Sequence, residues 1–107
     1  MSETDLARGI RQALVAKGCK LVRVQSGTVP LSYGGKVRFV HLAPKGTPDW
    51  LVIREGPVYT WLEIKLEGKE LNREQQAWHE WAVSLGIRVA TVHSITEAIR
   101  AVFSARL

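Results

Sequence analysis

The sequence predicts a single α/β domain in which helices flank a mixed β-sheet. Helical periodicity near both ends of the chain encloses segments in which apolar and polar residues alternate. Such alternation is typical of half-buried strands, and strands lying between helices favour a layered arrangement around one core. With 107 residues, the chain fits one domain, residues 1–107, and leaves no room for two.

The first expected element is a helix that begins after Ser2 and ends near Gly18. Ser2 and Asp5 have the spacing of a capping box, and a glycine suits the end of a helix. Glu3 falls on the apolar stripe of this helix, so it should face the interior or a cleft, whereas Asp5 lies almost opposite. That stripe consists of three residues at four-residue spacing: Leu6, Ile10 and Leu14.

Three or four strands are expected between the first helix and the second, from four candidate segments. They are residues 20–25, 36–42, 50–53 and 58–67. Residues 26–35 are expected to form a loop, because Gly27, Pro30 and two consecutive glycines interrupt them. A turn at Glu55-Gly56-Pro57 joins the last two strands.

A second helix over residues 71–85, a strand over 88–92 and a short final helix complete the predicted order. Gly86 marks the end of the second helix, and Ser94 suits the start of the third. The second helix has one apolar face, formed by Leu71, Trp78, Ala82 and Leu85. The predicted fold is therefore an α/β sandwich.

The charge of the chain favours a polyanionic partner. Lysine and arginine exceed the acidic residues by five, and the isoelectric point is near 9.8. This balance fits nucleic acid or an anionic membrane surface, although a merely soluble basic protein is also compatible with it. The longest aliphatic run is Leu51-Val52-Ile53, far too short to span a membrane. A polar N-terminus and a single cysteine, Cys19, predict a cytoplasmic location.

The strongest local argument concerns Asp49, Glu63 and Lys65. If the turn centred on Gly56 is the pivot of an antiparallel hairpin, Asp49 lies opposite Glu63, and Lys65 follows on the same face. Two opposed like charges destabilise a sheet, and a Mg²⁺ or Mn²⁺ ion would reverse that repulsion. The alternative is a solvated charged face that Lys65 partly neutralises.

Two further polar residues have two interpretations each. Glu3 either faces a cleft or simply favours the positive end of the helix dipole. Gln75 lies close to the apolar stripe of the second helix, but it also has the spacing to complete a capping box with Asn72. The sequence does not choose between these roles.

These residues resemble the PD-(D/E)xK nuclease signature. The matching segments are Gly46-Thr47-Pro48-Asp49, Glu63-Ile64-Lys65 and Leu71-Asn72-Arg73-Glu74-Gln75. More narrowly, the chain resembles the VRR-NUC family, the virus-type replication-repair nucleases, which are related to Holliday-junction resolvases. An early glutamate and the segment from Arg23 to Gly27 also fit. The resemblance covers nearly the whole chain and implies a restriction-endonuclease-like fold with an αβββαβ core.

The resemblance also implies roles for individual residues. Asp49 and Glu63 look like metal-binding carboxylates, with the main-chain carbonyl of Ile64 and the side chain of Glu3 as further ligands of Mg²⁺ or Mn²⁺. Lys65 looks like the catalytic lysine, and Gln75 like a glutamine that acts beside it. The chain departs from the usual pattern at Asn72, where serine or threonine is more common.

The implied function is metal-dependent endonucleolytic hydrolysis of DNA, selective for branched or junction structures, in phage or bacterial replication and repair. Expected phosphate contacts come from five basic residues: Lys36, Arg38, Lys45, Lys69 and Arg73. A two-fold homodimer is expected, because cutting two strands requires two active sites. The alternatives are a non-catalytic DNA-binding module on the same fold, and a subunit that serves assembly alone.

Overall fold

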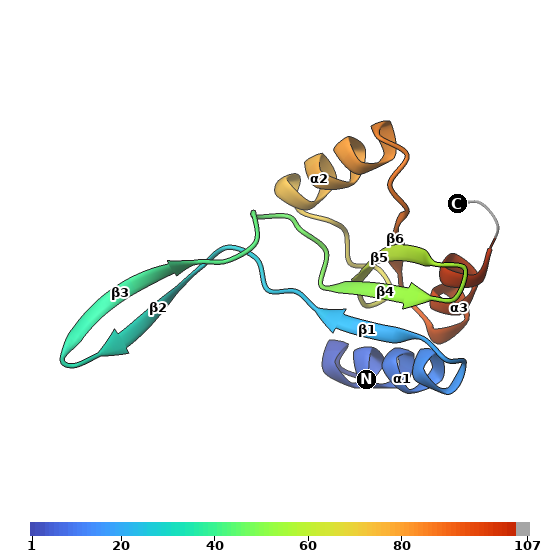
Figure 1. The fold of residues 1–107 in the computed structure, drawn as a ribbon, viewed down its shortest axis with the longest axis horizontal. Coiled ribbons are helices and arrows are strands. Elements are labelled where there is room, and N and C mark those ends of the chain that lie inside the picture. Colours follow the sequence, from blue (N-terminus) through green and yellow to red (C-terminus); the bar gives the residue numbers. More distant parts are fainter. Residues whose placement is uncertain (105–107) are drawn as a thin grey trace.

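The computed structural model describes residues 1–104, apart from the side chain of His41. Within these residues, three helices accompany six strands (Figure 1). The elements are α1 (Glu3–Ala16), β1 (Lys20–Arg23), β2 (Thr28–Tyr33), β3 (Lys36–His41), β4 (Trp50–Arg54), β5 (Val58–Ile64), α2 (Arg73–Ser84), β6 (Val89–Val92) and α3 (Ile95–Phe103). The predicted α/β class and the three helices are confirmed.

Four of the strands form a mixed central sheet in the order β1-β4-β5-β6. The pairs β1–β4 and β4–β5 are antiparallel, whereas β6 runs parallel to β5. The parallel pair requires a crossover, which α2 provides. The strand β5 ends at Ile64, whereas the predicted strand covered residues 58–67. Lys65 therefore lies just beyond the strand and not within it.

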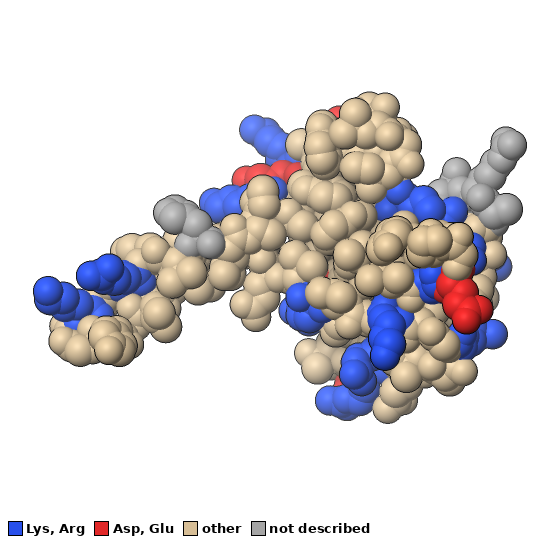
Figure 2. Space-filling view, in the orientation of Figure 1, with Lys and Arg blue, Asp and Glu red and all other residues tan. Residues whose placement is uncertain are grey.

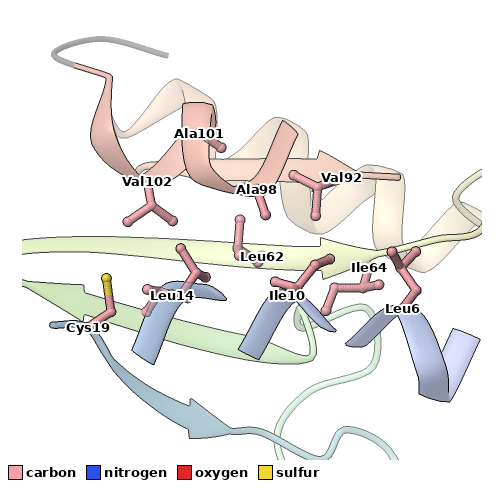
Figure 3. Close-up of a cluster of buried hydrophobic side chains, with 11 residues drawn as sticks. Leu6, Ile10, Leu14, Cys19, Leu62, Ile64, Val92, Ala98, Ala101 and Val102 are labelled. Atoms are coloured by element: carbon pink, nitrogen blue, oxygen red, sulfur yellow. The ribbon is translucent and has the colours of Figure 1, made fainter. Parts of the chain in front are cut away.

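The hydrophobic core lies on one face of this sheet, where α1 and α3 pack together (Figure 3). The predicted apolar stripe of α1 is buried in it, and the capping box between Ser2 and Asp5 is present. Eleven buried residues form the core: Leu6, Ile10, Leu14, Cys19, Val52, Leu62, Ile64, Val92, Ala98, Ala101 and Val102. No helix within residues 1–104 is both long and apolar enough to cross a membrane.

The helix α2 lies on the opposite face of the sheet. Because side chains alternate along β5, Trp61 points away from the core, and its ring meets that of Trp78 edge-on at 5.3 Å. The predicted apolar face of α2 is only partly covered: Ala82 is fully buried, but Leu85 is 60% exposed. This helix is therefore held by fewer apolar contacts than α1 and α3.

The expectation of a loop over residues 26–35 is wrong. Residues Thr28–Tyr33 form β2, which pairs with β3 in a separate two-stranded sheet that projects from the body of the molecule (Figure 1). Gly34 and Gly35 form its two-residue turn with positive φ angles of 56° and 77°. Glycine adopts such angles without a steric penalty, and paired positive φ angles match the twist of a hairpin.

Candidate active site

The pairing of β4 with β5 places Asp49 opposite Glu63. Trp50 is paired with Leu62 in the antiparallel ladder. One residue further along, Asp49 therefore lies opposite Glu63. This is the register predicted from the turn between the strands. The main-chain carbonyl of Asp49 accepts a 2.8 Å hydrogen bond from the Val24 amide, which ties this end of β4 to the chain after β1. Two acidic side chains are therefore held at the same end of the sheet.

Glu63 is buried, and its carboxyl group is only partly satisfied. The residue is 1% exposed, and its Oε1 atom has no hydrogen-bond partner within residues 1–104. Burial raises the pKa of Glu63 to about 9, and a hydrogen bond with Asp49 and the negative charges of Asp49 and Glu3 add to this effect. The positive charge of Lys65 acts in the opposite direction. At neutral pH the protein alone therefore keeps a proton on this carboxyl group.

A cavity of about 110 Å³ brings the first turn of α1 next to these strands. Seven residues form its wall: Glu3, Thr4, Ala7, Arg23, Asp49, Trp50 and Ile64. Three of the four predicted metal ligands, Glu3, Asp49 and Ile64, thus line one cavity. The fourth is Glu63, and the negative charge of Glu3 helps to raise its pKa. Their role as ligands stays a prediction.

This set of groups fits a small divalent cation. Carboxylate and carbonyl oxygens are the ligands that Mg²⁺ and Mn²⁺ prefer. A buried carboxyl oxygen without a partner is unfavourable unless another group compensates for the lost solvation. A cation at this position would compensate for it and would replace the proton on Glu63. The donor chemistry and the unpartnered Oε1 of Glu63 therefore agree with a metal site.

Lys65 lies two residues beyond Glu63, half-buried, immediately after β5. Its amide donates a 3.0 Å hydrogen bond to the carbonyl of Val92, which extends the pairing of β5 with β6 by one residue. The backbone is therefore fixed at this position. The charge of Lys65 lowers the pKa of Glu63, so the ammonium group lies close enough to interact with the acidic pair.

Gln75 completes a capping box at the start of α2. Its side-chain Oε1 accepts a 2.9 Å hydrogen bond from the main-chain N–H of Asn72. The main-chain N–H of Gln75 donates a 2.8 Å hydrogen bond to Asn72 Oδ1. The cap engages Oε1 and leaves Nε2 as the donor for another partner. Gln75 lines a cavity of about 420 Å³ with Lys45 and Gly46, separate from the cavity that holds Glu3 and Asp49. A catalytic role for Gln75 stays a prediction.

The loop before Asp49 packs tightly against the first turn of α2. Gly46 has a positive φ of 90°, and a Cβ atom there would collide with the main-chain carbonyl of Glu74. Thr47 is buried, and its hydroxyl donates a 2.6 Å hydrogen bond to the carbonyl of Pro44. The Gly-Thr-Pro segment therefore fixes the path of the chain into Asp49.

Replacement of Gly46 by alanine is expected to destabilise the fold more than the same change at Gly18. Both glycines have φ near 90°, which costs an alanine roughly 1–2 kcal/mol. Gly18 has open space around it, whereas Gly46 would also force the loop away from Glu74. We expect Gly46→Ala to lower the free energy of unfolding by at least ~1 kcal/mol more than Gly18→Ala in chemical denaturation. Equal losses would contradict the close packing of this loop.

Arg23 belongs to the same cavity, although the sequence assigned it no role beyond a matching segment. The β1–β4 ladder pairs Arg23 with Trp50, and the guanidinium group lies 5.3 Å from the centre of the indole ring. This contact holds a positive charge in the wall that also carries Glu3 and Asp49. Its position in the strand paired with β4 is the signal that could have identified it.

The five predicted DNA contacts fall into two groups. Lys36 and Arg38 lie on the projecting hairpin, where Figure 2 shows basic side chains near the tip. Lys45 lines the cavity beside Gln75, and Lys69 and Arg73 flank the start of α2. Their contact with DNA stays a prediction.

A second group of candidate metal ligands follows the carboxyl ends of β5 and β6 and includes one residue of α3. Atoms of Glu67, His93 and Glu97 that could ligate a metal lie within 4.8 Å of one another. His93 Nδ1 lies 3.3 Å from Glu97 Oε1, so an ion pair is an alternative use of these two groups. Any experiment on metal binding must therefore separate this group from Asp49 and Glu63.

Comparison with known proteins supports the predicted fold. A solved structure described as a VRR_NUC domain matches this chain with a TM-score of 0.68, over 96% of each chain and at 23% sequence identity. The mixed sheet flanked by helices is consistent with that restriction-endonuclease-like fold. At this level of identity the likeness shows the fold alone. No protein-family model and no curated protein matches the sequence.

Proposed function

We propose that this chain is a nuclease of the VRR-NUC type, a metal-dependent endonuclease that hydrolyses phosphodiester bonds in DNA. The observation that carries the proposal is the pairing of Asp49 with the buried, partly unsatisfied Glu63, beside Lys65. A protein that used this fold for binding alone would have no need of two opposed acids, because repulsion and burial both destabilise them.

Asp49 and Glu63 would hold a Mg²⁺ or Mn²⁺ ion, with Glu3 and the main-chain carbonyl of Ile64 as further ligands. Such an ion supplies Lewis-acid stabilisation of the charge that develops on phosphate oxygens and activates water as a nucleophile. The side chain of Glu3 projects from the first turn of α1, so it would reach the ion directly or through water. Arg23, in the same wall, would attract the phosphate group.

Lys65 and Gln75 would act on the reacting groups. The ammonium group of Lys65 would donate hydrogen bonds to the scissile phosphate or orient the attacking water. Gln75, with Oε1 in the helix cap, would use Nε2 to position Lys65 or that water. The backbone of Lys65 is held by its hydrogen bond to β6, and that of Gln75 by the capped start of α2. A fixed backbone favours precise positioning of both side chains.

The proposed substrate is branched or junction DNA from replication or repair in a bacterial or phage-infected cell. Lys45, Lys69 and Arg73 would contact phosphates beside α2, while Lys36 and Arg38 would contact them from the hairpin. A two-fold homodimer would supply the second active site that cutting both strands requires.

A cleavage assay tests this function. Wild-type protein is incubated with a panel of linear and branched DNAs in the presence of Mg²⁺, Mn²⁺ or a chelator, alongside Lys65→Ala. We expect cleavage with either metal, none with the chelator, and a loss of at least ~100-fold in Lys65→Ala. Binding of DNA by wild type without cleavage under any of these conditions would favour the non-catalytic alternative. Equal cleavage by wild type and variant would indicate a contaminating enzyme.

A further inference from the structure

Within residues 1–104, the strands β2 and β3 pair only with each other and form a hairpin separate from the central sheet. Every described residue from Thr28 to Val40 is exposed. A two-stranded hairpin on its own is marginally stable in water, so an extended one that stands free is expected to have a partner. Figure 1 shows it reaching well beyond the body of the domain.

Side chains on one face of the hairpin combine apolar, aromatic and basic groups. The ladder pairs Leu31 with Arg38 and Tyr33 with Lys36, so these four residues lie on the same face. They line a hollow of about 560 Å³ together with Gly34. Tyr33 is 81% exposed beside the turn. This face therefore offers a partner both apolar contact and positive charge.

The distribution of charge along the chain identifies the kind of partner. From Leu6 to Pro48 the sequence contains eight lysine and arginine residues and no aspartate or glutamate. The hairpin lies inside this segment, and Figure 2 shows lysine and arginine near its tip with no acidic side chain beside them. A second copy of the hairpin would therefore offer it no negative charge. A phosphate backbone would do so along its whole length.

We propose that the β2–β3 hairpin is a DNA-binding arm that enters a groove of the duplex beside the cleavage site. This proposal rests on the proposed nuclease function and names the part of the protein that holds the flanking duplex. A two-stranded ribbon fits the major groove of B-form DNA. Lys36 and Arg38 contact phosphates, and Tyr33 packs against bases or sugars at the end of the arm.

The length of the arm sets the length of duplex it contacts. Each strand has six residues, which at about 3.4 Å per residue gives an arm of roughly 20 Å. DNA rises about 3.4 Å per base pair, so the arm covers about six base pairs. Duplexes too short to reach the arm should therefore not benefit from it.

The proposal is tested by DNA binding without metal, which separates it from catalysis. The double variant Lys36→Ala/Arg38→Ala is compared with Arg11→Ala/Lys20→Ala, which removes the same charge from exposed residues on α1 and β1. Fluorescence anisotropy is measured over a range of salt concentrations on a labelled duplex about three helical turns long. We expect the arm variant to bind about tenfold more weakly, with a salt slope reduced by about two, and the control to lose much less.

Three results would overturn the arm. The first is an equal loss of DNA affinity in the arm variant and the control variant. The second is an arm variant that binds DNA as tightly as wild type. The third is an arm variant that retains DNA affinity but no longer self-associates in ultracentrifugation. The last would identify the hairpin as a contact between two copies of the chain. Because the arm lies outside the core, thermal unfolding of its variant should match wild type. If wild type neither binds nor cuts DNA, the proposed nuclease function is wrong. If wild type cuts DNA and the arm variant binds DNA as wild type does, only the proposed role of the arm is wrong.

Discussion

Asp49→Asn is expected to reduce the rate of DNA cleavage by on the order of 10³-fold or more. The substitution keeps the size of the side chain but removes a negative charge from the proposed metal site. Asparagine is a weaker ligand for Mg²⁺ than a carboxylate, and the opposed Glu63 would then have to hold the ion almost alone. Single-turnover cleavage of a labelled DNA in Mg²⁺ measures this effect.

DNA binding should survive the same substitution. Removing an acid from a surface that contacts phosphates leaves the affinity unchanged or raises it slightly. Glu80→Gln is the control, because Glu80 is exposed on α2 and is not part of the wall that Glu3 and Asp49 line. We expect that control to cleave at the wild-type rate. Cleavage by Asp49→Asn within tenfold of wild type would exclude Asp49 as an essential metal ligand.

Glu63→Gln is expected to stabilise the metal-free protein at neutral and alkaline pH. Burial and the neighbouring Asp49 raise the pKa of Glu63 from 4.5 to about 9 in the folded state. Between these values the folded state binds more protons than the unfolded state, so stability falls as pH rises, by up to about 1.4 kcal/mol per pH unit. This contribution is fully present below pH 4.5 and is lost as pH rises to 9. Glutamine remains neutral and lacks this dependence.

Chemical denaturation at several pH values measures the difference. At about pH 8 without metal, Glu63→Gln should exceed wild type in free energy of unfolding by roughly 4–5 kcal/mol, and the gap should close as pH falls below 4.5. Glu80→Gln, an exposed position within α2, serves as control and should follow wild type throughout. Parallel curves for wild type and Glu63→Gln would show that this carboxyl group titrates normally.

The acidic pair could be predicted because local rules determine it. A glycine-proline turn fixes the hairpin register, and alternation along the strands decides which side chains share a face. Asp49 and Glu63 are only fourteen residues apart in sequence, so few alternative pairings compete. The caps at Ser2 and Asn72 were equally local, since each depends on residues within one helical turn.

The rest depends on contacts between distant segments. The segment over residues 26–35 was expected to be a loop because of its glycines and Pro30. Val29, Leu31 and Tyr33 do alternate with other residues, but neither face of that hairpin is buried, so no core contact requires the strand. Arg23 joins the cavity only because β1 pairs with β4. Periodicity places Gln75 on the inner side of α2, but the cavity it lines depends on how α2 packs.

Metal binding by wild type and Asp49→Asn, measured by calorimetric titration with Mn²⁺, tests the central claim most directly. If Asp49 and Glu63 hold the ion, wild type binds Mn²⁺ at this site and releases close to one proton at about pH 7, because the metal displaces the proton on Glu63. Asp49→Asn should lose this binding, whereas His93→Ala, in the second group of candidate ligands, should retain it. Binding that persists in Asp49→Asn and disappears in His93→Ala would contradict the account.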